Sequence, residues 1–249
     1  MGRKRIIPCL LLQNESLVKT IRFKKPSYIG DAINTVRIFN ELEVDELILL
    51  DITATTSKSE PNFDLLKDIA SECFMPLAYG GGVNTLEQAK KIIKIGYEKV
   101  IINSAAYSDK DLITQIADEL GSQCVLGSID VKKNLFGSYN VYSQSGKKKE
   151  NVNPFEWAKE LQELGAGEIM ITSINQEGTW EGFDMGLIKK ITKQVNVPVI
   201  AHGGAGSGRD IEQVFSLSVN AAAVGSMVVY QKKGMGVLVN MKNIINDNE

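Results

Sequence analysis

Three pairs of segments in this 249-residue chain resemble each other at one constant separation. ELILLDIT begins at Glu46 and EIMITSIN at Glu168, MPLAYGGG begins at Met75 and VPVIAHGG at Val197, and VIINSAA begins at Val100 and AAVGSMV at Ala222. The starting positions differ by 122 in each pair (168 − 46, 197 − 75, 222 − 100). Chance similarity would not hold one offset across three segments. We therefore expect one domain, residues 1–249, built from two similar halves that span residues 1–122 and 123–249.

Short apolar runs alternate with amphipathic stretches along the whole chain. The runs expected to be strands are Arg5–Leu10, Glu46–Asp51, Pro76–Tyr79, Lys99–Ile102, Gln123–Ile129, Glu168–Thr172, Val197–Ala201 and Ala221–Val224. Helices are expected at Asp31–Leu42, Leu86–Ile95, Lys110–Leu120, Pro154–Leu164 and Met185–Lys193. This alternation predicts a parallel sheet. A length near the ~250 residues of a single barrel favours closure into a (β/α)₈ TIM barrel of two duplicated (β/α)₄ halves.

The composition is that of an ordinary globular protein, with 43% hydrophobic residues, 23% charged residues and a formal net charge of −2. The basic cluster Lys147–Lys149 precedes Glu150 and is expected in a solvated loop, so nothing indicates binding of nucleic acid. No apolar run is long enough to span a membrane. Three widely spaced cysteines and one histidine argue against a metal site and are typical of a reduced, cytoplasmic protein, and no cofactor is expected.

Two connections are longer than usual for this alternation. Residues Leu11–Gly30 contain LVKTIRF, and residues Val131–Val152 alternate around Ser145-Gly146 in the manner of a hairpin. Both follow strands, so both are expected at the C-terminal rim of the barrel, where enzymes of this fold place their active sites. Lys19, in the first connection, could close over a substrate anion or remain in solvent.

Glycine clusters follow the third and seventh expected strands, and a small polar pair follows the fourth and eighth. Glycine lets the backbone approach a ligand closely, and the N-terminus of a following helix offers free N–H groups to an anion. The alternative is that these glycines only form tight turns. Because the pattern occurs in both halves, we expect a ligand with a phosphate at each end, bound by Gly81, Gly82, Asn103, Ser104, Gly203, Gly204, Gly225 and Ser226.

Polar side chains at other strand ends are candidates for the chemistry. Asp51 and Asp130 end the second and fifth strands, where a carboxylate points into the barrel mouth and can act as a general acid or base. Each could instead cap the next turn. His202 ends the seventh strand, where a histidine more often fills the mouth than reacts. Thr172 and Glu177, at the end of the sixth strand, are expected to face the same mouth.

Four charged residues stand at strand starts, at the opposite end of the barrel. They are Arg5, Glu46, Lys99 and Glu168, two positive and two negative. This balance suits a closed ring of ion pairs. The alternative is that they are ordinary polar strand entrances in water.

The segments KRIIPCL, DELILLDIT, GGG, INSAA, GSQCVLGSID, EWAKELQELGAGEI and VIAHGGAGS together resemble the cyclase subunit of imidazole glycerol phosphate synthase over nearly the whole chain. The resemblance implies a glutaminase subunit on the N-terminal face of the barrel. It implies that ammonia passes a gate of four charged residues and reacts at the C-terminal face with a ribulosyl aminoimidazole bisphosphate. The gate residues match Arg5, Glu46, Lys99 and Glu168, and the family's loop lysine matches Lys19.

The sequence departs from that family at its catalytic residues. The family has an aspartate after PCL, where this chain has Leu11, although the partner aspartate is kept as Asp130. Losing one general acid or base typically removes about 10²–10⁴ in rate. In the DRDG run of the family, Asn175 and Glu177 replace the two aspartates, and the longer carboxylate can misplace a proton transfer. The catalytic candidates are therefore Asp130, Glu177 and Lys19. We expect the cyclisation reaction of the family to be changed or lost in this chain.

PCLLL, LVKTIRFKKPSYIGD, EPNFDLL and ECFMPLAYGGG resemble the branch of the family associated with acetamidino modification of bacterial surface sugars. The resemblance implies that barrel and glutaminase supply ammonia to a separate sugar amidotransferase. Two alternatives stay open. One is an active cyclase of histidine biosynthesis, and the other is a non-catalytic barrel that binds a phosphorylated ligand.

Overall fold

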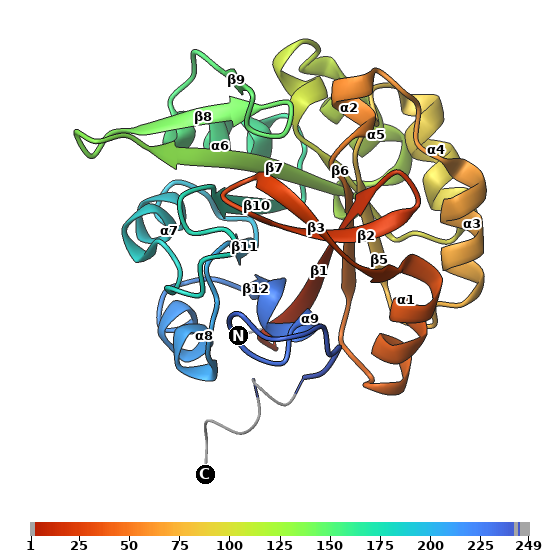
Figure 1. Ribbon diagram of the computed structural model, residues 1–249. Helices are drawn as coiled ribbons and strands as arrows, with labels where there is room; N and C mark the ends of the chain where they lie inside the picture. The colour runs from red at the N-terminus through yellow and green to blue at the C-terminus, as the bar shows by residue number, and fades with distance from the viewer. Residues whose placement is uncertain (1–2, 242–243, 245–249) are drawn as a thin grey trace.

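Eight parallel strands form a closed barrel in the computed structural model, which describes residues 3–241 and 244 (Figure 1). β1 pairs with β12, and β7 pairs with β10, so the sheet has no open edge within the barrel. The predicted (β/α)₈ barrel is therefore confirmed. The barrel strands are β1 (Arg5–Gln13), β4 (Leu47–Asp51), β5 (Leu77–Gly80), β6 (Lys99–Ile102), β7 (Val125–Lys133), β10 (Glu168–Ser173), β11 (Val199–His202) and β12 (Ala221–Val224).

Helices surround the barrel strands (Figure 1). They are α1 (Ala32–Glu41), α2 (Ala54–Ser57), α3 (Phe63–Ser71), α4 (Leu86–Ile95), α5 (Asp111–Leu120), α6 (Pro154–Glu163), α7 (Met185–Ile191), α8 (Gly208–Phe215) and α9 (Ser226–Val229), with 3₁₀ turns η1 (Ser104–Tyr107) and η2 (Ser122–Cys124). Local sequence determines where several of these helices begin. Asn153 accepts a hydrogen bond from the Phe155 amide ahead of Pro154, and Ser207 forms a capping box with Asp210. α2, α3, α8 and α9 were not among the helices named from the sequence.

The two long connections fold as antiparallel extensions rather than irregular loops. After β1, β2 (Ser16–Ile21) and β3 (Lys24–Asp31) form a hairpin. After β7, β8 (Tyr139–Ser143) and β9 (Lys148–Lys149) continue the sheet, and the predicted hairpin at Ser145-Gly146 joins these two strands. β1 runs three residues and β7 four residues beyond their expected ends, because each pairs there with its own extension.

Apolar side chains fill the barrel interior and, separately, the layer between strands and helices. The interior cluster includes Ile7, Ile48, Leu126, Met170 and Ile200, all at most 1% exposed. We call this interior cluster the apolar plug. The charged strand starts lie on its N-terminal side and the polar strand ends on its C-terminal side. This order positions one charged end and one polar mouth along the barrel axis.

No helix in the described part of the chain is long and apolar enough to cross a membrane. Among the same residues, no group of three or more histidine, cysteine, aspartate or glutamate side chains is arranged to hold a metal ion.

Candidate functional site at the barrel mouth

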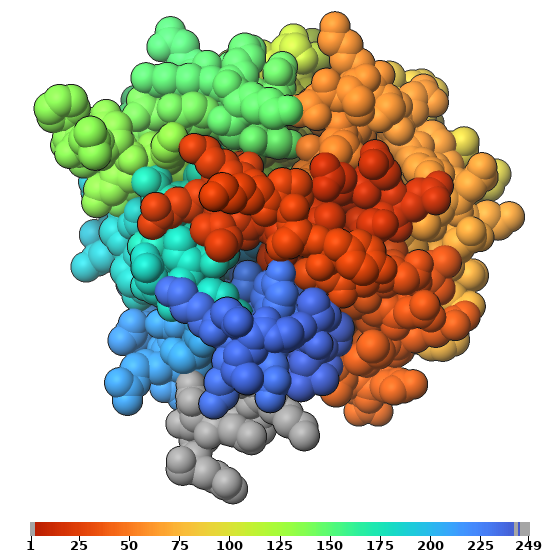
Figure 2. Space-filling model, in the orientation of Figure 1, coloured from red at the N-terminus to blue at the C-terminus, as the bar shows by residue number. Residues whose placement is uncertain are grey.

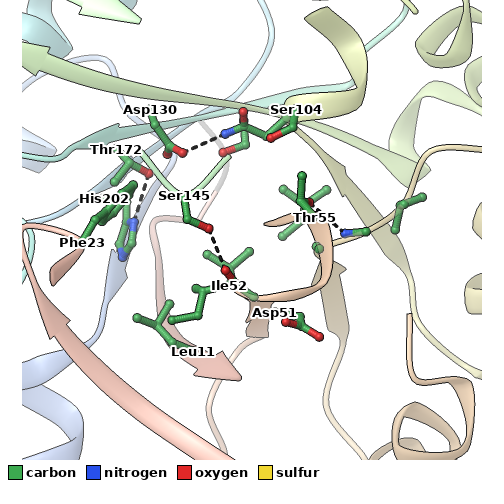
Figure 3. A pocket seen from close by; sticks show the side chains of 18 of the residues that line it. Leu11, Phe23, Asp51, Ile52, Thr55, Ser104, Asp130, Ser145, Thr172 and His202 are labelled. Atoms are coloured by element: carbon green, nitrogen blue, oxygen red, sulfur yellow. Dashed lines mark hydrogen bonds between the residues drawn. The ribbon is translucent and has the colours of Figure 1, made fainter. Parts of the chain in front are cut away.

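A cavity of about 130 Å³ lies at the C-terminal ends of the strands (Figure 3). Its wall contains many of the predicted site residues, from both halves of the chain. These are Asp51, Gly81, Gly82, Asn103, Ser104, Asp130, Thr172, Glu177 and His202. Leu11, Leu50 and Ile101 add an apolar part to the wall. The predicted residues are thus gathered in one place.

The two extensions meet over this cavity and form its roof. In Figure 2 the hairpin β2–β3 covers the centre of the face, between the residues of β8 and the C-terminal segment. Phe23, at the hairpin tip, lines the cavity and lies against Gly146, while the Ser145 hydroxyl donates a hydrogen bond to the Ile52 carbonyl. Sequence reasoning missed Phe23 and Ser145. Ser145 was named only as part of the expected hairpin turn of the second connection, and Phe23 only as part of LVKTIRF in the first.

Asp130 is a poised acid or base in the cavity. Its Oδ2 accepts a hydrogen bond from the Asn103 amide at 3.0 Å. Burial raises the pKa of Asp130 to about 7, because desolvation outweighs the hydrogen bonds from Asn103 and Thr172, and nearby Glu177 adds to the increase. A carboxyl group with this pKa can either donate or accept a proton near neutral pH.

His202 is neutral and held by a neighbouring hydroxyl. Its Nδ1 lies 3.1 Å from Oγ1 of Thr172. Burial, with the positive charge of Lys19, lowers the pKa of His202 to about 3. The ring therefore carries no charge at physiological pH and is a weak base. This agrees with the expectation that it mainly fills the mouth.

Leu11 supplies no acid or base to the cavity, and Asp51 has one carboxylate oxygen engaged in a turn. Leu11 is 4% exposed, lines the cavity and pairs with Val18 of the hairpin. Figure 3 shows its side chain in the cavity wall, away from Asp130. Oδ1 of Asp51 accepts hydrogen bonds from the Thr53 amide, the Thr53 hydroxyl and the Ala54 amide, at 2.8 to 2.9 Å. Asp51 thus caps the start of α2, which is the structural alternative considered for it.

Lys19 is buried in β2, so the alternative of a lysine in solvent is wrong. Its side chain is 3% exposed and its Nζ lies 4.0 Å from Oε1 of Glu177. A second, smaller cavity places it among the predicted phosphate residues of the second half, Gly203, Gly204, Gly225 and Ser226. A Cβ atom added to Gly225 would lie 2.3 Å from the ammonium nitrogen, so glycine leaves room for the lysine.

Glu177 ties the first hairpin to the mouth. Its Oε1 accepts a hydrogen bond from the Thr20 hydroxyl and its Oε2 accepts one from the Phe23 amide, both at 3.0 Å. The Arg22 amide donates to the Glu177 carbonyl at 2.9 Å. Both carboxylate oxygens are thus engaged in holding the roof. This contact network supports a positioning role for Glu177 rather than the catalytic role expected from the sequence.

The predicted phosphate glycines are also required by packing. Gly81 has φ of +126°, and a Cβ atom there would lie 2.4 Å from the Asp51 carbonyl oxygen. Gly204 has φ of +114°, and its Cβ would lie 2.0 Å from the Gly182 carbonyl oxygen. In the first half, the Gly82 amide and the Ser104 hydroxyl already bond to protein groups, Thr55 and the Gln144 amide. Tight turns therefore account for Gly81 and Gly204, and anion binding at the glycines stays a prediction.

The four charged strand starts form a closed ring at the other end of the barrel. Arg5 contacts Glu46 and Glu168 through its two terminal nitrogens. Lys99 contacts the remaining oxygens of the same carboxylates at 2.7 and 3.0 Å. The two carboxylate side chains are 5% and 8% exposed. The alternative of separate polar strand entrances in water does not describe this arrangement.

Comparison with known proteins places these features in a family. The model of the family described as histidine biosynthesis protein matches residues 5–234. A subunit of Pseudomonas aeruginosa, provisionally named as an imidazole glycerol phosphate synthase subunit, is 51% identical over 98% of both chains, and one of Vibrio vulnificus, provisionally named in the same way, is 45% identical over 96% of this chain and 93% of its own. The imidazole glycerol phosphate synthase subunit of Streptococcus sanguinis is 36% identical over 92% of this chain and 91% of its own. The chain therefore belongs to the histidine biosynthesis protein family.

Proposed function

We propose that this chain is a synthase-type subunit that receives ammonia from a glutaminase partner and passes it through the barrel to the mouth. The observation that carries the proposal is the contrast between the two ends of the barrel. One end has a complete ring of four charges, and the other has a carboxyl group poised near neutral pH, Asp130, in a cavity where Leu11 supplies an apolar wall.

The interior favours a small neutral molecule over an ion. The plug between ring and mouth is made of aliphatic side chains and the Cys9 thiol, whose pKa is raised by burial to about 12. Moving an unpaired charge into such surroundings costs several kcal/mol or more. Ammonia, unlike ammonium, avoids this cost. Passage requires one of the ring's ion pairs to open, because the ring lies at the start of the interior.

The mouth is equipped to hold a phosphorylated ligand but poorly equipped for cyclisation. Lys19, which lines the smaller cavity with Gly203, Gly204 and Gly225, offers positive charge to an anion, and Asp130 offers one proton. Leucine neither donates nor accepts a proton, so a reaction that needs an acid and a base on facing walls lacks one of them. We infer that ammonia is used by another enzyme. The branch resemblance gives a sugar amidotransferase that forms acetamidino groups on a bacterial surface sugar.

An active cyclase of histidine biosynthesis is the second candidate. The observation in its favour is the pKa of Asp130, which burial raises to about 7, since one group with that pKa can in turn donate and accept a proton. A non-catalytic barrel that binds a phosphorylated ligand is the third. This third candidate requires that the ring of four charged residues does not let ammonia through.

The first test is turnover of the ribulosyl aminoimidazole bisphosphate substrate with excess ammonium salt at high pH. Free ammonia then bypasses the glutaminase. We expect no turnover by the folded wild-type chain. Turnover close to that of an ordinary cyclase would contradict the proposal and favour the second candidate.

The variant Leu11→Asp tests the cause of the loss. It restores a carboxylate to the cavity, on the wall that faces Asp130, and we expect cyclase activity above the wild-type background. Leu11→Asn is the matched control, because it introduces a polar group of the same size without a titratable proton. Equal activity of both variants would mean that position 11 does not limit the chemistry.

The glutaminase supplies the readout that separates the first and third candidates. An ammonia-delivering barrel should increase glutamine hydrolysis when it binds its glutaminase and should release ammonia at the mouth. A barrel that binds the glutaminase without any change in hydrolysis would support the non-catalytic candidate.

A further inference from the structure

A basic groove lies beside the mouth, outside the cavity described above. Its volume is about 470 Å³ and it is lined by Ile21, Arg22, Lys24, Lys25, Lys132, Ile174 and Asn175. Four of these residues are cationic and none is acidic. Within the part of the chain that the structure describes, none of the four forms an ion pair with a carboxylate. The chain as a whole carries a net charge of −2, so this is a local concentration of uncompensated positive charge.

The groove is a built site rather than a chance gathering of lysines. Asn175 joins its two walls, since its carbonyl accepts a hydrogen bond from Arg22 Nε at 3.0 Å and its side-chain amide pairs with the Lys133 backbone at 2.7 and 3.2 Å. The Lys132 ammonium lies 5.8 Å from the centre of the Tyr142 ring. The first hairpin and the β7–β8 extension are thereby held in a fixed relation.

The backbone is strained at the tip of the β2–β3 hairpin, next to the groove. Arg22, Phe23 and Lys25 have φ of +55°, +61° and +51°, a left-handed conformation that usually falls to glycine or asparagine. Each such residue costs about 1–2 kcal/mol relative to an unstrained one. Asn-Gly would relieve the turn but would remove the Phe23 roof and the Arg22 guanidinium. Strain of this kind at a concave, charged surface is typical of a functional site.

We propose that this groove binds the diphosphate-class group of a small organic ligand, next to the barrel mouth. Its volume lies in the range of about 300–1,000 Å³ that is usual for small-molecule sites. Four cations with no acid between them favour an anion of at least two charges over a single carboxylate. Arg22 keeps its terminal guanidinium nitrogens for phosphate oxygens, because only its Nε is engaged. The aliphatic side chains of Ile21 and Ile174 offer an apolar surface to the rest of the ligand.

The same hairpin separates groove and cavity. Thr20 and Phe23 line the cavity, whereas Ile21, Arg22, Lys24 and Lys25 line the groove. A ligand anchored in the groove could therefore reach the edge of the mouth. That this ligand is the ammonia acceptor rests on the proposed function, but binding of the anion does not.

The test uses inorganic pyrophosphate and uridine diphosphate as probes, titrated calorimetrically into the full chain at low salt. The double variant Lys24→Gln/Lys132→Gln removes two groove charges, and Lys147→Gln/Lys149→Gln removes two exposed charges from the β8–β9 hairpin outside the groove. We expect the groove variant to bind at least about tenfold more weakly, since losing a charged hydrogen-bond donor commonly costs that much. The control variant should bind as the wild type does, and uridine diphosphate should bind more tightly than pyrophosphate.

Lysine acetylation with and without pyrophosphate, read by mass spectrometry, locates the bound anion. Protection of Lys24, Lys25 and Lys132, with Lys147–Lys149 unprotected, would support the groove. Equal weakening in both double variants would reduce the effect to general surface charge and overturn the inference. Loss of binding in Lys19→Gln, with the groove variant binding as the wild type does, would assign the anion to the mouth and overturn it as well. Absence of binding by the wild type would also overturn it, leaving the groove to an acidic protein surface. None of these outcomes depends on ammonia transfer.

Discussion

Replacing Asp130 with asparagine should change the pH dependence of stability in a predictable way. The pKa of Asp130 is about 7 in the folded chain, against an ordinary value of 3.8, because the carboxyl is desolvated at the mouth. Between these two values the folded state binds one proton more than the unfolded state. The contribution of Asp130 to the free energy of unfolding therefore falls as pH rises from about 4 to about 7, and stays constant above that.

The magnitude follows from the size of this difference. A tenfold change in proton affinity corresponds to about 1.4 kcal/mol, so the full cost of ionising buried Asp130 is at most roughly 4 kcal/mol. Asparagine resembles the protonated acid and can still accept the hydrogen bond from Asn103. Asp130→Asn should thus be about as stable as the wild type near pH 4, and more stable by up to roughly 4 kcal/mol at pH 8.

His202 acts in the opposite direction and must be separated from Asp130. Burial lowers its pKa from 6.5 to about 3, so the unfolded state binds the extra proton and stability rises with pH across that window. In the wild type, the contributions of Asp130 and His202 to the pH dependence of the free energy of unfolding partly cancel between about pH 4 and 6.5. The difference between variant and wild type removes the His202 contribution, because it is present in both.

The assay is urea denaturation of both proteins at half-unit steps from pH 4 to pH 8.5. The exposed Asp118 provides the matched control, because Asp118→Asn makes the same chemical change outside the cavity. The same pH profile for Asp130→Asn as for this control would show that the carboxyl is not desolvated. Lower stability of Asp130→Asn at pH 8 would show that the ionised group has a partner, and would refute the reasoning.

Three further predictions concern the ring, the roof and a glycine. Lys99→Met leaves two buried carboxylates with Arg5 alone and should lower the free energy of unfolding by about 3 kcal/mol. The control Lys90→Met breaks an exposed pair with Glu119 and should lower it by less than about 1 kcal/mol. Similar losses for both variants in urea denaturation would contradict the closed ring. Glu177→Gln removes one hydrogen-bond acceptor from the hairpin and should speed hydrogen exchange of the Phe23 amide, measured by NMR, by about tenfold. The control Glu181→Gln alters an exposed carboxylate and should leave this exchange rate unchanged. Unchanged exchange in Glu177→Gln would count against a positioning role. Gly204→Ala should lower the melting temperature clearly, because its Cβ would overlap the Gly182 carbonyl, and a stable variant would mean that this turn can shift.

Much of the barrel was predictable from periodicity alone. The eight strands lie where apolar runs lie, and outside β1 and β7 their ends agree with the expected ones to within two residues. The ring residues were also predictable as a group, because charges at the starts of parallel strands meet at one end of a barrel. Such features depend on short-range pattern and on one general rule of topology.

The roles of individual side chains depended on contacts that the sequence does not specify. Asp51 could serve as cap or base, and only the positions of the Thr53 and Ala54 amides decide for the cap. Lys19 could be in solvent or buried, and its burial follows from how the hairpin folds back over the mouth. The Arg22-Phe23 turn was not predictable, since neither residue favours the conformation it adopts. The basic cluster at Lys147–Lys149 is contiguous in the sequence, whereas the groove lysines are brought together from two separate extensions.

The ring of ion pairs makes the two halves of the chain unequal. Glu46 and Glu168 occupy equivalent positions at the 122-residue offset, but Arg5 and Lys99 correspond to Gly127 and Ala221, which carry no charge. The first half therefore contributes one net positive charge to the ring and the second half one net negative charge. Two copies of the first half, closed into a barrel of their own, would gather a net charge of two at this end, and two copies of the second half would bury two carboxylates without a cation. If the chain arose by duplication, each half now depends on the other for electrical neutrality, and neither could return to an independent existence without new charges at these positions.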